Sequence, residues 1–300
     1  MKVLYWLKLL IKAFLIAILI VAVGTYVFFI PRIFGYTCGQ MILMPFPPDE
    51  SYEYKSLRGV EKQDVFIGTG DSAKLHGWLY KLPDSKYVAL ISHGNAGHIG
   101  GRLLLADALL DSGISVLLYD YRGYGRSTGS SKLQTLVPDA DAAFTYLVHE
   151  QNYKPAQIIL VGESIGCAVT SDLLKLHPDV AGIVLVSPFT SLLRLARQKI
   201  PYFYVYPDFL DFDPAFNNME MVQAAHPPLL ITHGDRDTLV PFSESEELFA
   251  AAIEPKMFMP LKNGGHNDYI QDHEFFKKGV LDYLKSVDAA AAQKSVSGAH

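Results

Sequence analysis

The stretch Gly162–Gly166, with the sequence GESIG, follows the apolar run Ile158–Val161 and precedes a helix-like segment that ends near His177. A strand that delivers a serine to a tight turn, with a helix leaving at once, exposes the Ser164 hydroxyl as a nucleophile. The flanking glycines let two backbones pass where a Cβ would clash. The following helix also points its positive end at the place where negative charge forms in acyl transfer. Because this short pattern also arises by chance, the rest of the chain must supply its partners.

A carboxylate that can orient a histidine follows a later apolar run, Leu229–Ile231, within the segment His233–Pro241. Two candidates stand in that segment, Asp235 and Asp237. Asp235 would lie tighter against the strand end, where aspartate commonly forms turns. We therefore expect Asp237 to hold the catalytic histidine and to stabilise its charged form.

The histidine expected to act as general base is His266, on a glycine-flanked loop after the apolar stretch Met257–Leu261. Two other histidines lie downstream of Asp237, one at the start of the last expected helix and one in the C-terminal tail. Neither has a comparable loop setting. The chain order Ser164, Asp237, His266 is the order found in one class of serine hydrolases.

Acyl transfer also requires two backbone N–H groups aimed at the tetrahedral oxyanion. One is expected from Ile165, the residue after the nucleophile. The other is expected from Asn95, in the glycine-rich segment His93–Gly97. An ordinary turn between a strand and a helix has a similar composition, so this assignment depends on the turn lying beside Ser164.

Six motifs in this order resemble those of the α/β-hydrolase superfamily, and more narrowly its Bem46/ABHD13-like branch of membrane-anchored serine hydrolases. They are HGNAG at 93–97, DYRGYGRSTG at 120–129, GESIG at 162–166, SPFTS at 187–191, HGDRDTLVP at 233–241 and GGH at 264–266. The resemblance covers about residues 40–287 and implies an esterase, lipase or thioesterase that forms an acyl-enzyme on Ser164. A peptidase or amidase would use the same triad, and a non-catalytic ligand-binding protein could keep the same fold. One departure is His98, where relatives often carry a polar amide; it could alter the pocket rim or begin a helix.

Apolar runs that alternate with helix-length patterns predict an α/β-hydrolase fold, with a mostly parallel eight-stranded sheet, helices on both faces and a short cap. The first two strands are expected to be antiparallel. Strands are expected at Asp64–Ile67, Leu75–Tyr80, Val88–Ser92, Val116–Tyr119, Ile158–Val161, Ile183–Ser187, Leu229–Thr232 and Met257–Met259. Helices are expected at Gly100–Ser112, Pro138–Asn152, Ser164–His177, Ser191–Lys199, Phe242–Ala252 and His273–Ser286.

The N-terminus carries an uncharged apolar run, Ala13–Ile30, which is about 27 Å long as a helix. Three lysines precede this run, and this bias places the N-terminus in the cytoplasm and the catalytic domain on the extracytoplasmic side. A cleaved signal peptide is the first alternative, with small residues at Ala22–Gly24, and a buried core helix is the second. Because apolar sequence continues through Tyr26–Ile30, we favour a retained transmembrane anchor.

These observations divide the chain into four parts. They are an N-terminal membrane anchor (1–32), a connecting segment (33–62), a hydrolase domain (63–287) with a short cap at 189–226, and a disordered tail (288–300). The connecting segment is expected to pack on the hydrolase or to lie at the membrane surface. The cap is rich in aromatic residues, which either line an apolar acyl pocket over Ser164 or pack a short helix against the core.

Charge and motif content limit the possible partners. The chain has a net charge of −5, and residues 1–32 hold four cations and no acid, so the remainder is acidic and suits nucleic acid poorly. The sequence contains no zinc-type spacing, phosphate loop or dinucleotide fingerprint, so we expect no cofactor and no metal. The expected partners are a small-molecule or lipid-like acyl substrate and, through the N-terminal helix, a membrane. The sequence leaves the oligomeric state open.

Overall fold

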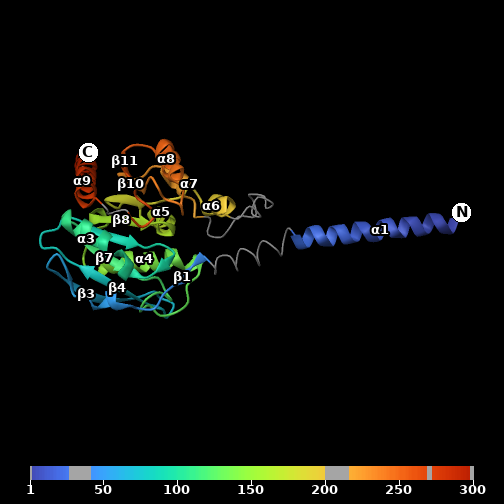
Figure 1. Cartoon of the computed structure of the whole chain (residues 1–300), viewed down its shortest axis with the longest axis horizontal. Coiled ribbons are helices and arrows are strands. Elements are labelled where there is room, and N and C mark those ends of the chain that lie inside the picture. Colours follow the sequence, from blue (N-terminus) through green and yellow to red (C-terminus); the bar gives the residue numbers. More distant parts are fainter. Residues whose placement is uncertain (1, 27–41, 200–215, 269–271, 298–300) are drawn as a thin grey trace.

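The computed structural model describes residues 2–26, 42–199, 216–268 and 272–297 (Figure 1). The strands are β1 (Met44–Pro45), β2 (Ser56–Leu57), β3 (Val60–Gly68), β4 (Lys74–Tyr80), β5 (Val88–Ser92), β6 (Ala96–Gly97), β7 (Ser115–Tyr119), β8 (Ile158–Glu163), β9 (Gly182–Val186), β10 (Leu229–Gly234) and β11 (Lys256–Leu261). The α-helices are α1 (Lys2–Gly24), α3 (Leu103–Asp111), α4 (Leu133–His149), α5 (Ile165–Leu176), α6 (Leu192–Lys199), α7 (Asn218–Gln223), α8 (Phe242–Ala251) and α9 (His273–Ser297). Short 3₁₀ helices are η2 (Glu50–Glu53), η3 (Ile99–Arg102) and η4 (Pro155–Gln157).

The main sheet has the strand order β11-β10-β9-β8-β5-β7-β4-β3-β2. The strands from β7 to β11 along this order are parallel, and β4, β3 and β2 continue the sheet in antiparallel pairs. All eight expected strands are present, and the mostly parallel sheet with an antiparallel start is confirmed. The sheet gains one strand that the sequence did not predict, β2, because Arg58 and Gly59 adopt positive φ (49° and 77°) and turn the chain back onto β3.

The sheet separates two hydrophobic layers because successive side chains of a buried parallel strand point to opposite faces. In β5, Val88 and Leu90 join the layer that contains α4, α5 and α8, whereas Ala89 and Ile91 join the layer that contains α3 and α9. Helices therefore cover both faces, as expected (Figure 1). The carboxyl ends of the parallel strands are left free to carry loops.

Two helices depart from their expected bounds. Helix α4 begins at Leu133 and keeps Pro138 inside it, because Leu133 and Leu136 are buried in the core and the Thr135 hydroxyl accepts the Lys132 N–H, 3.1 Å. Helix α9 continues to Ser297, so the tail expected to be disordered is helical over 288–297. Four consecutive alanines, the strongest helix formers, extend it.

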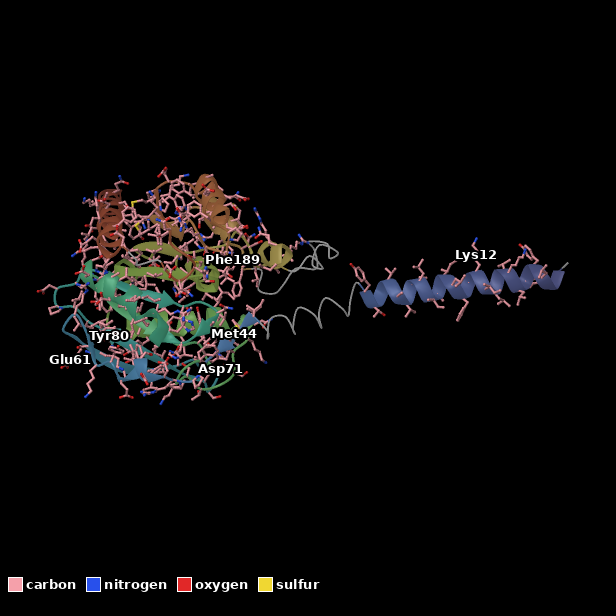
Figure 2. All side chains as sticks on the ribbon, in the orientation of Figure 1. Lys12, Met44, Glu61, Asp71, Tyr80 and Phe189 are labelled. Carbon is pink, nitrogen blue, oxygen red and sulfur yellow. The ribbon has the colours of Figure 1, made fainter. Side chains whose placement is uncertain are left out.

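The N-terminal helix α1 is longer at its start than the expected anchor. Its span Leu4–Gly24 has a mean hydropathy of 2.5 and none of it is buried, and among the described residues it is the one helix with the length and composition to cross a membrane. Figure 2 shows side chains, Lys12 among them, projecting from all around this helix. The alternative of a buried core helix is therefore wrong. Residues 27–30 of the expected anchor lie outside the described residues.

The connecting segment packs on the main domain over its described part. Strand β1 pairs in parallel with β6, and β2 and the first residues of β3 already belong to the main sheet, so the domain begins before the expected boundary at residue 63. The cap is described at both ends, as α6 and as Phe216 with α7. Two interpretations of the cap, an acyl pocket or a helix packed on the core, depend on its aromatic residues at 202–216. All of these except Phe216 lie outside the described residues, and Phe216 is buried in the core.

Candidate active site

Ser164 occupies a strained turn between β8 and α5. Its φ of 55° and ψ of −118° fall in a region that non-glycine residues seldom adopt. The two flanking glycines are required by close packing: a Cβ on Gly162 would lie 2.5 Å from the Cα of Cys167, and one on Gly166 would lie 2.0 Å from the Ser92 carbonyl oxygen. The predicted elbow is therefore confirmed in its geometry, and its serine sits at the carboxyl edge of the sheet.

Asp237 and His266 meet at the same edge, on the loops after β10 and β11. The Nδ1 atom of His266 lies 2.6 Å from Oδ2 of Asp237. Asp235 instead accepts the N–H of Asn263, on the loop after β11, at 2.6 Å, so its side chain joins two loops and does not close the local turn expected of it. The choice of Asp237 over Asp235 thus agrees with the geometry. Since the carboxylate accepts the Nδ1 proton, Nε2 of a neutral His266 ring is left as an acceptor.

Asp237 is held in its ionised form by four donors. His233 Nε2 lies 3.0 Å from Oδ2, and the N–H groups of Leu239 and Val240 donate to Oδ1 at 2.8 and 2.9 Å. Burial alone would raise the pKa of Asp237, but the hydrogen bonds from His233 and His266 and the charge of His266 outweigh burial and hold that pKa well below its usual value. This role of His233 could not be predicted from its place in the sequence.

The end of β9 contacts both Ser164 and His266. The Ser164 N–H donates to the Val186 carbonyl at 2.9 Å, and the hydroxyl of the next residue, Ser187, lies 3.5 Å from the His266 carbonyl oxygen. Within the described residues the Ser164 hydroxyl itself has no hydrogen-bond partner, so its contact with Nε2 of His266 is not formed in this state. Such contacts commonly tighten only when substrate binds.

The segment His93–Gly97, which we call the oxyanion loop, lies against the elbow. A Cβ on Gly94 would lie 3.5 Å from Cβ of Ser164. His93 is buried, and burial together with the charge of Arg102 holds its pKa well below the usual value, so its ring is neutral at pH 7. Its Nδ1–H donates to the Gly94 carbonyl at 2.7 Å, since a carbonyl oxygen can only accept.

That bond fixes the peptide whose N–H is the expected oxyanion donor. The Gly94 carbonyl and the Asn95 N–H belong to one planar trans peptide and point in opposite directions. Within the described part of the chain the Asn95 N–H has no acceptor of its own. Ile165 opens helix α5, where the first N–H groups have no intrahelical acceptor either. Both N–H groups expected at the oxyanion are therefore available.

Glu163 and Arg102 join the elbow to the oxyanion loop. Arg102 donates to both carboxylate oxygens of Glu163, at 2.8 and 3.1 Å, and its Nη1 also donates to the Ala96 carbonyl at 2.8 Å. Glu163 is almost fully buried. This role of Arg102 could not be predicted from the sequence, where its single signal is its position in the first turns after the loop.

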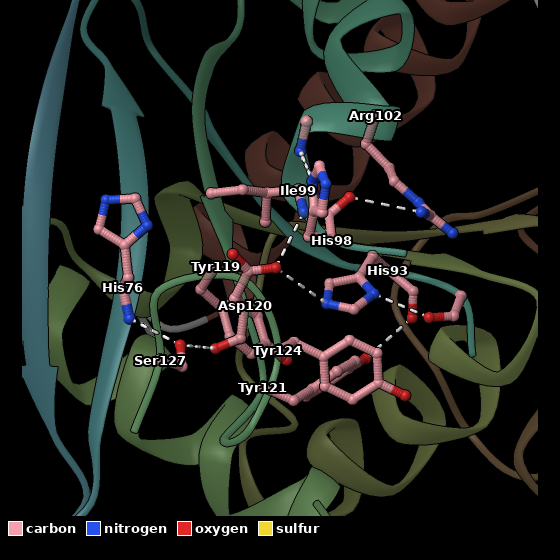
Figure 3. A network of polar contacts seen from close by, with 12 residues as sticks. His76, His93, His98, Ile99, Arg102, Tyr119, Asp120, Tyr121, Tyr124 and Ser127 are labelled. Carbon is pink, nitrogen blue, oxygen red and sulfur yellow. Dashed lines mark hydrogen bonds and ion pairs between the residues drawn. The ribbon is translucent and has the colours of Figure 1, made fainter. Parts of the chain in front are cut away.

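A second buried carboxylate, Asp120, lies behind the oxyanion loop (Figure 3). Its Oδ2 accepts the Tyr52 hydroxyl at 2.5 Å, and its Oδ1 accepts the Ile99 N–H at 2.8 Å. His93 Nε2 lies 3.6 Å from Oδ1. Burial raises the pKa of Asp120 to about 7 despite the hydrogen bond from Tyr52. His98 caps η3 by accepting the Gly100 N–H, 3.1 Å, which is the helix-start role expected of it.

A separate ion pair braces the loop after β7. Arg122 donates through its backbone N–H to Asp139 at 2.9 Å, and through Nε and Nη2 to the same side chain at 2.8 and 2.6 Å. Arg122 thus braces this loop through Asp139, and Asp120 braces it through its bonds to Tyr52 and Ile99. Among the described residues no group of three or more His, Cys, Asp or Glu side chains is placed to hold a metal ion.

The nine-stranded sheet with a serine elbow after β8 defines an α/β hydrolase, and comparisons with known proteins agree. Residues 83–205 match the family described as "Serine aminopeptidase, S33". An uncharacterized protein of Mycobacterium tuberculosis is 39% identical over 208 residues, which is 69% of this chain and 73% of that protein. Alpha/beta hydrolase domain-containing protein 17B of Xenopus tropicalis is 32% identical over 206 residues, 67% of this chain and 69% of that protein.

Solved structures show the same fold. An esterase of Pyrococcus furiosus aligns with a TM-score of 0.64 at 24% identity, over 81% of this chain and 97% of the esterase. These structures show the fold, and the relative from Xenopus tropicalis at 32% identity shows the family: the chain belongs to the α/β-hydrolase superfamily.

Proposed function

We propose that this chain is a membrane-anchored serine hydrolase that cleaves carboxylic ester or thioester bonds through an acyl-enzyme on Ser164. The observation that carries the proposal is the 2.6 Å contact between His266 and an ionised Asp237, on loops at the sheet edge where the strained turn presents Ser164. A nucleophile, a base and an orienting carboxylate at one edge are the parts of acyl transfer.

The proposed reaction is a double displacement. His266 Nε2 takes the Ser164 proton as Oγ attacks the carbonyl carbon, and the N–H groups of Asn95 and Ile165 stabilise the oxyanion. Asp237 keeps the Nδ1 proton in place and stabilises the imidazolium. His266 then protonates the leaving alcohol or thiol. A water molecule, deprotonated by the same nitrogen, releases the acid and restores Ser164.

The N-terminal helix supports a substrate near a membrane. Helix α1 has the length and composition of an anchor, and the lysines near its start favour a cytoplasmic N-terminus with the catalytic domain on the extracytoplasmic side. The proposal therefore includes acyl or lipid-like substrates, and membership of the Bem46/ABHD13-like branch. Removal of α1 as a signal peptide is the outcome that would overturn the anchor, and N-terminal sequencing of the mature protein from both the membrane and the soluble fractions of native cells reads it directly.

Fluorophosphonate labelling of the full chain in detergent tests the activity. Wild type and Asp107→Asn, which changes only an exposed ion pair with Arg58, are compared with Ser164→Ala and His266→Ala, and p-nitrophenyl esters of increasing chain length serve as substrates. We expect labelling of wild type that Ser164→Ala abolishes, and kcat/KM that rises with chain length. A folded wild type that neither labels nor turns over any ester would favour a non-catalytic ligand-binding protein. Equal or better turnover of the shortest ester would count against lipid-like substrates.

A peptidase or amidase with the same triad is the second candidate, because the family matched by residues 83–205 is described as a serine aminopeptidase. The same residues would act, with His266 protonating a leaving amine. Aminoacyl p-nitroanilides compared with the matched p-nitrophenyl esters decide between the two. The ester proposal predicts a kcat/KM ratio of ester to anilide well above the ratio for uncatalysed hydrolysis.

A further inference from the structure

The segment that leads from α1 into the domain is built into the oxyanion loop. We call residues 42–57 the strap. Within it, β1 pairs in parallel with β6, with Met44 opposite Ala96 and Pro45 opposite Gly97. This two-stranded sheet is separate from the main sheet. The oxyanion loop therefore takes its strand pairing from the strap and not from the core of the domain.

Three hydrogen bonds fix the strap to the loop on either side of the expected oxyanion donor. The Met44 N–H donates to the Asn95 carbonyl at 2.9 Å, and the Phe46 N–H donates to the Gly97 carbonyl at 3.1 Å. The Asn95 side-chain amide donates in return to the Ile42 carbonyl at 2.9 Å. Asn95 is thus held by both its backbone and its side chain.

The loop 121–127 completes this clamp from the other side. The Tyr124 hydroxyl donates to the same Asn95 carbonyl oxygen at 2.7 Å, and the Gly125 N–H donates to the Phe46 carbonyl at 3.1 Å. Two donors on one carbonyl leave the peptide little freedom to rotate. Because the Asn95 N–H is on the preceding peptide, whose carbonyl is held by His93, the torsions on both sides of this residue are fixed.

The second half of the strap secures the helix that follows the loop. Tyr52 is 4% exposed, and its hydroxyl donates to Asp120, which accepts the Ile99 N–H through its other oxygen. Ser51 fills the space over Gly100, where a Cβ would lie 1.7 Å from its hydroxyl oxygen. Figure 3 shows Asp120 between Ile99 and His93. Through its hydrogen bonds to Tyr52 and Ile99, this carboxylate joins the strap to η3, directly after the loop.

The side chains of β1 point outward, which shows that the strap acts through its backbone at this point. Met44 is 46% and Phe46 is 55% exposed, whereas Leu43, the strap residue just before β1, is buried in the core. A core-building strand would bury alternate side chains deeply. Here the exposed strand contributes N–H and carbonyl groups to a loop beside the nucleophile.

We propose that the strap is a positioning element for catalysis, which orients the Asn95 N–H toward the oxyanion through the Met44 N–H and through Tyr52 and Asp120. This inference rests on the proposed function, because it assigns a role in the same reaction. The strap is also the first described segment after α1. The part of the chain that leads to the expected membrane anchor is therefore the part that sets the oxyanion donor.

Met44→Pro in the full chain in detergent tests the strap, with Met44→Ala as the matched control. Proline removes the N–H that donates to Asn95, while alanine keeps it and trims a half-exposed side chain. We expect Met44→Pro to lower kcat on a p-nitrophenyl ester by about tenfold at unchanged KM, less than the loss of a whole oxyanion donor. Met44→Ala should stay within about twofold of wild type.

A transition-state analogue separates positioning from general damage. An aryl trifluoromethyl ketone binds as a tetrahedral oxyanion adduct, so its Ki should rise in Met44→Pro by the same factor by which kcat/KM falls. Fluorophosphonate titration normalises each variant to its active fraction. Tyr52→Phe, which removes one hydroxyl, serves as the second variant and should show the same coupled changes by a few-fold.

The outcomes are distinct. If Met44→Pro has the same kcat and the same Ki as Met44→Ala, and Tyr52→Phe is unchanged from wild type, the positioning role of the strap is wrong while the proposed function stands. If Met44→Pro fails to fold, Tyr52→Phe decides by the same two measurements. A wild type without ester turnover or Ser164 labelling would overturn the proposed function and the strap with it.

Discussion

Asp120 and Asp237 are both buried at the carboxyl edge of the sheet, yet their surroundings are opposite. Asp237 accepts from two histidines and two backbone N–H groups, and its pKa is held below the usual value against the effect of burial. Asp120 accepts from one tyrosine and one backbone N–H, and burial raises its pKa to about 7. Asp237 has more donors, two histidines among them, and Asp120 is more deeply buried; both differences favour the ionised form at Asp237 over that at Asp120.

This difference in pKa gives the two carboxylates different roles at the carboxyl edge of the sheet. The ionised Asp237 can stabilise the positive charge that His266 acquires during the reaction. Asp120, which touches no expected reacting group, joins the strap to η3, directly after the oxyanion loop. The comparison therefore predicts that the first carboxylate acts through its charge and the second through its hydrogen bonds.

The largest effect expected is that of Asp237→Asn on turnover. The amide would present a donor to His266 and favour the wrong tautomer, so kcat should fall about 10⁴-fold. Asp120→Asn keeps an oxygen for the Ile99 N–H and should lower kcat by less than about tenfold. Steady-state hydrolysis of a p-nitrophenyl ester, corrected by active-site titration, measures both. Equal losses in the two variants would break the comparison.

The pH dependence of stability should distinguish the same two residues. The unfolded chain ionises Asp120 near pH 3.8 and the folded chain near 7, so wild type should lose stability relative to Asp120→Asn as pH rises between these values, by at most about 4 kcal/mol. The difference should stay constant above that range. Asp237, with its lowered pKa, contributes the opposite slope: its stabilisation is present above about pH 4 and is lost as pH falls further.

Urea unfolding of the full chain in detergent, at a series of pH values, measures these slopes. The free-energy difference between wild type and Asp120→Asn is the quantity to plot, because other titrating groups cancel in it. If wild type instead gains stability relative to Asp120→Asn as pH rises, the donors to Asp120 favour its ionised form and the prediction is wrong.

A smaller effect is expected where the two sides of the edge meet, at Glu163 and Arg102. Glu163→Gln removes the charge from a buried bidentate pair that also holds the oxyanion loop, so kcat should fall about tenfold at unchanged KM. The matched control is Asp107→Asn, which breaks the exposed pair with Arg58. Exposed pairs contribute about 0–1 kcal/mol, so this variant should match wild type. Similar kinetics in both variants would remove the ion pair from the account.

Much of this arrangement could be predicted from the sequence. Strands that are buried on both faces have continuous apolar sequences, which can be recognised directly, and all eight expected strands are present. The choice of Asp237 over Asp235 followed from how far each lies beyond the strand, and the contact with His266 agrees with it. The glycines of the elbow were also readable, because their close backbone contacts tolerate no Cβ. The catalytic roles themselves remain predictions.

The parts that sequence reasoning missed depend on contacts between distant segments. Strand β1 is only two residues long and contains a proline, so its pairing with β6 could not be predicted from a local sequence pattern. His233 acts through Asp237, on the loop that follows it, and Arg102 acts through Glu163, 61 residues away in the chain. Neither residue type signals such a role by itself. Helix α4 begins before its proline because burial of Leu133 and Leu136 outweighs the local preference.

Trapping of the acyl-enzyme tests the central claim most directly. Wild type and Ser164→Ala would be mixed with a slowly deacylating p-nitrophenyl ester, quenched with acid within the first turnover, digested and read by mass spectrometry. The account predicts that the peptide containing Ser164 gains the mass of the acyl group, with a matching burst of p-nitrophenol, and that Ser164→Ala shows neither. Ester cleavage by wild type with the acyl group on another residue, or on none, would contradict it.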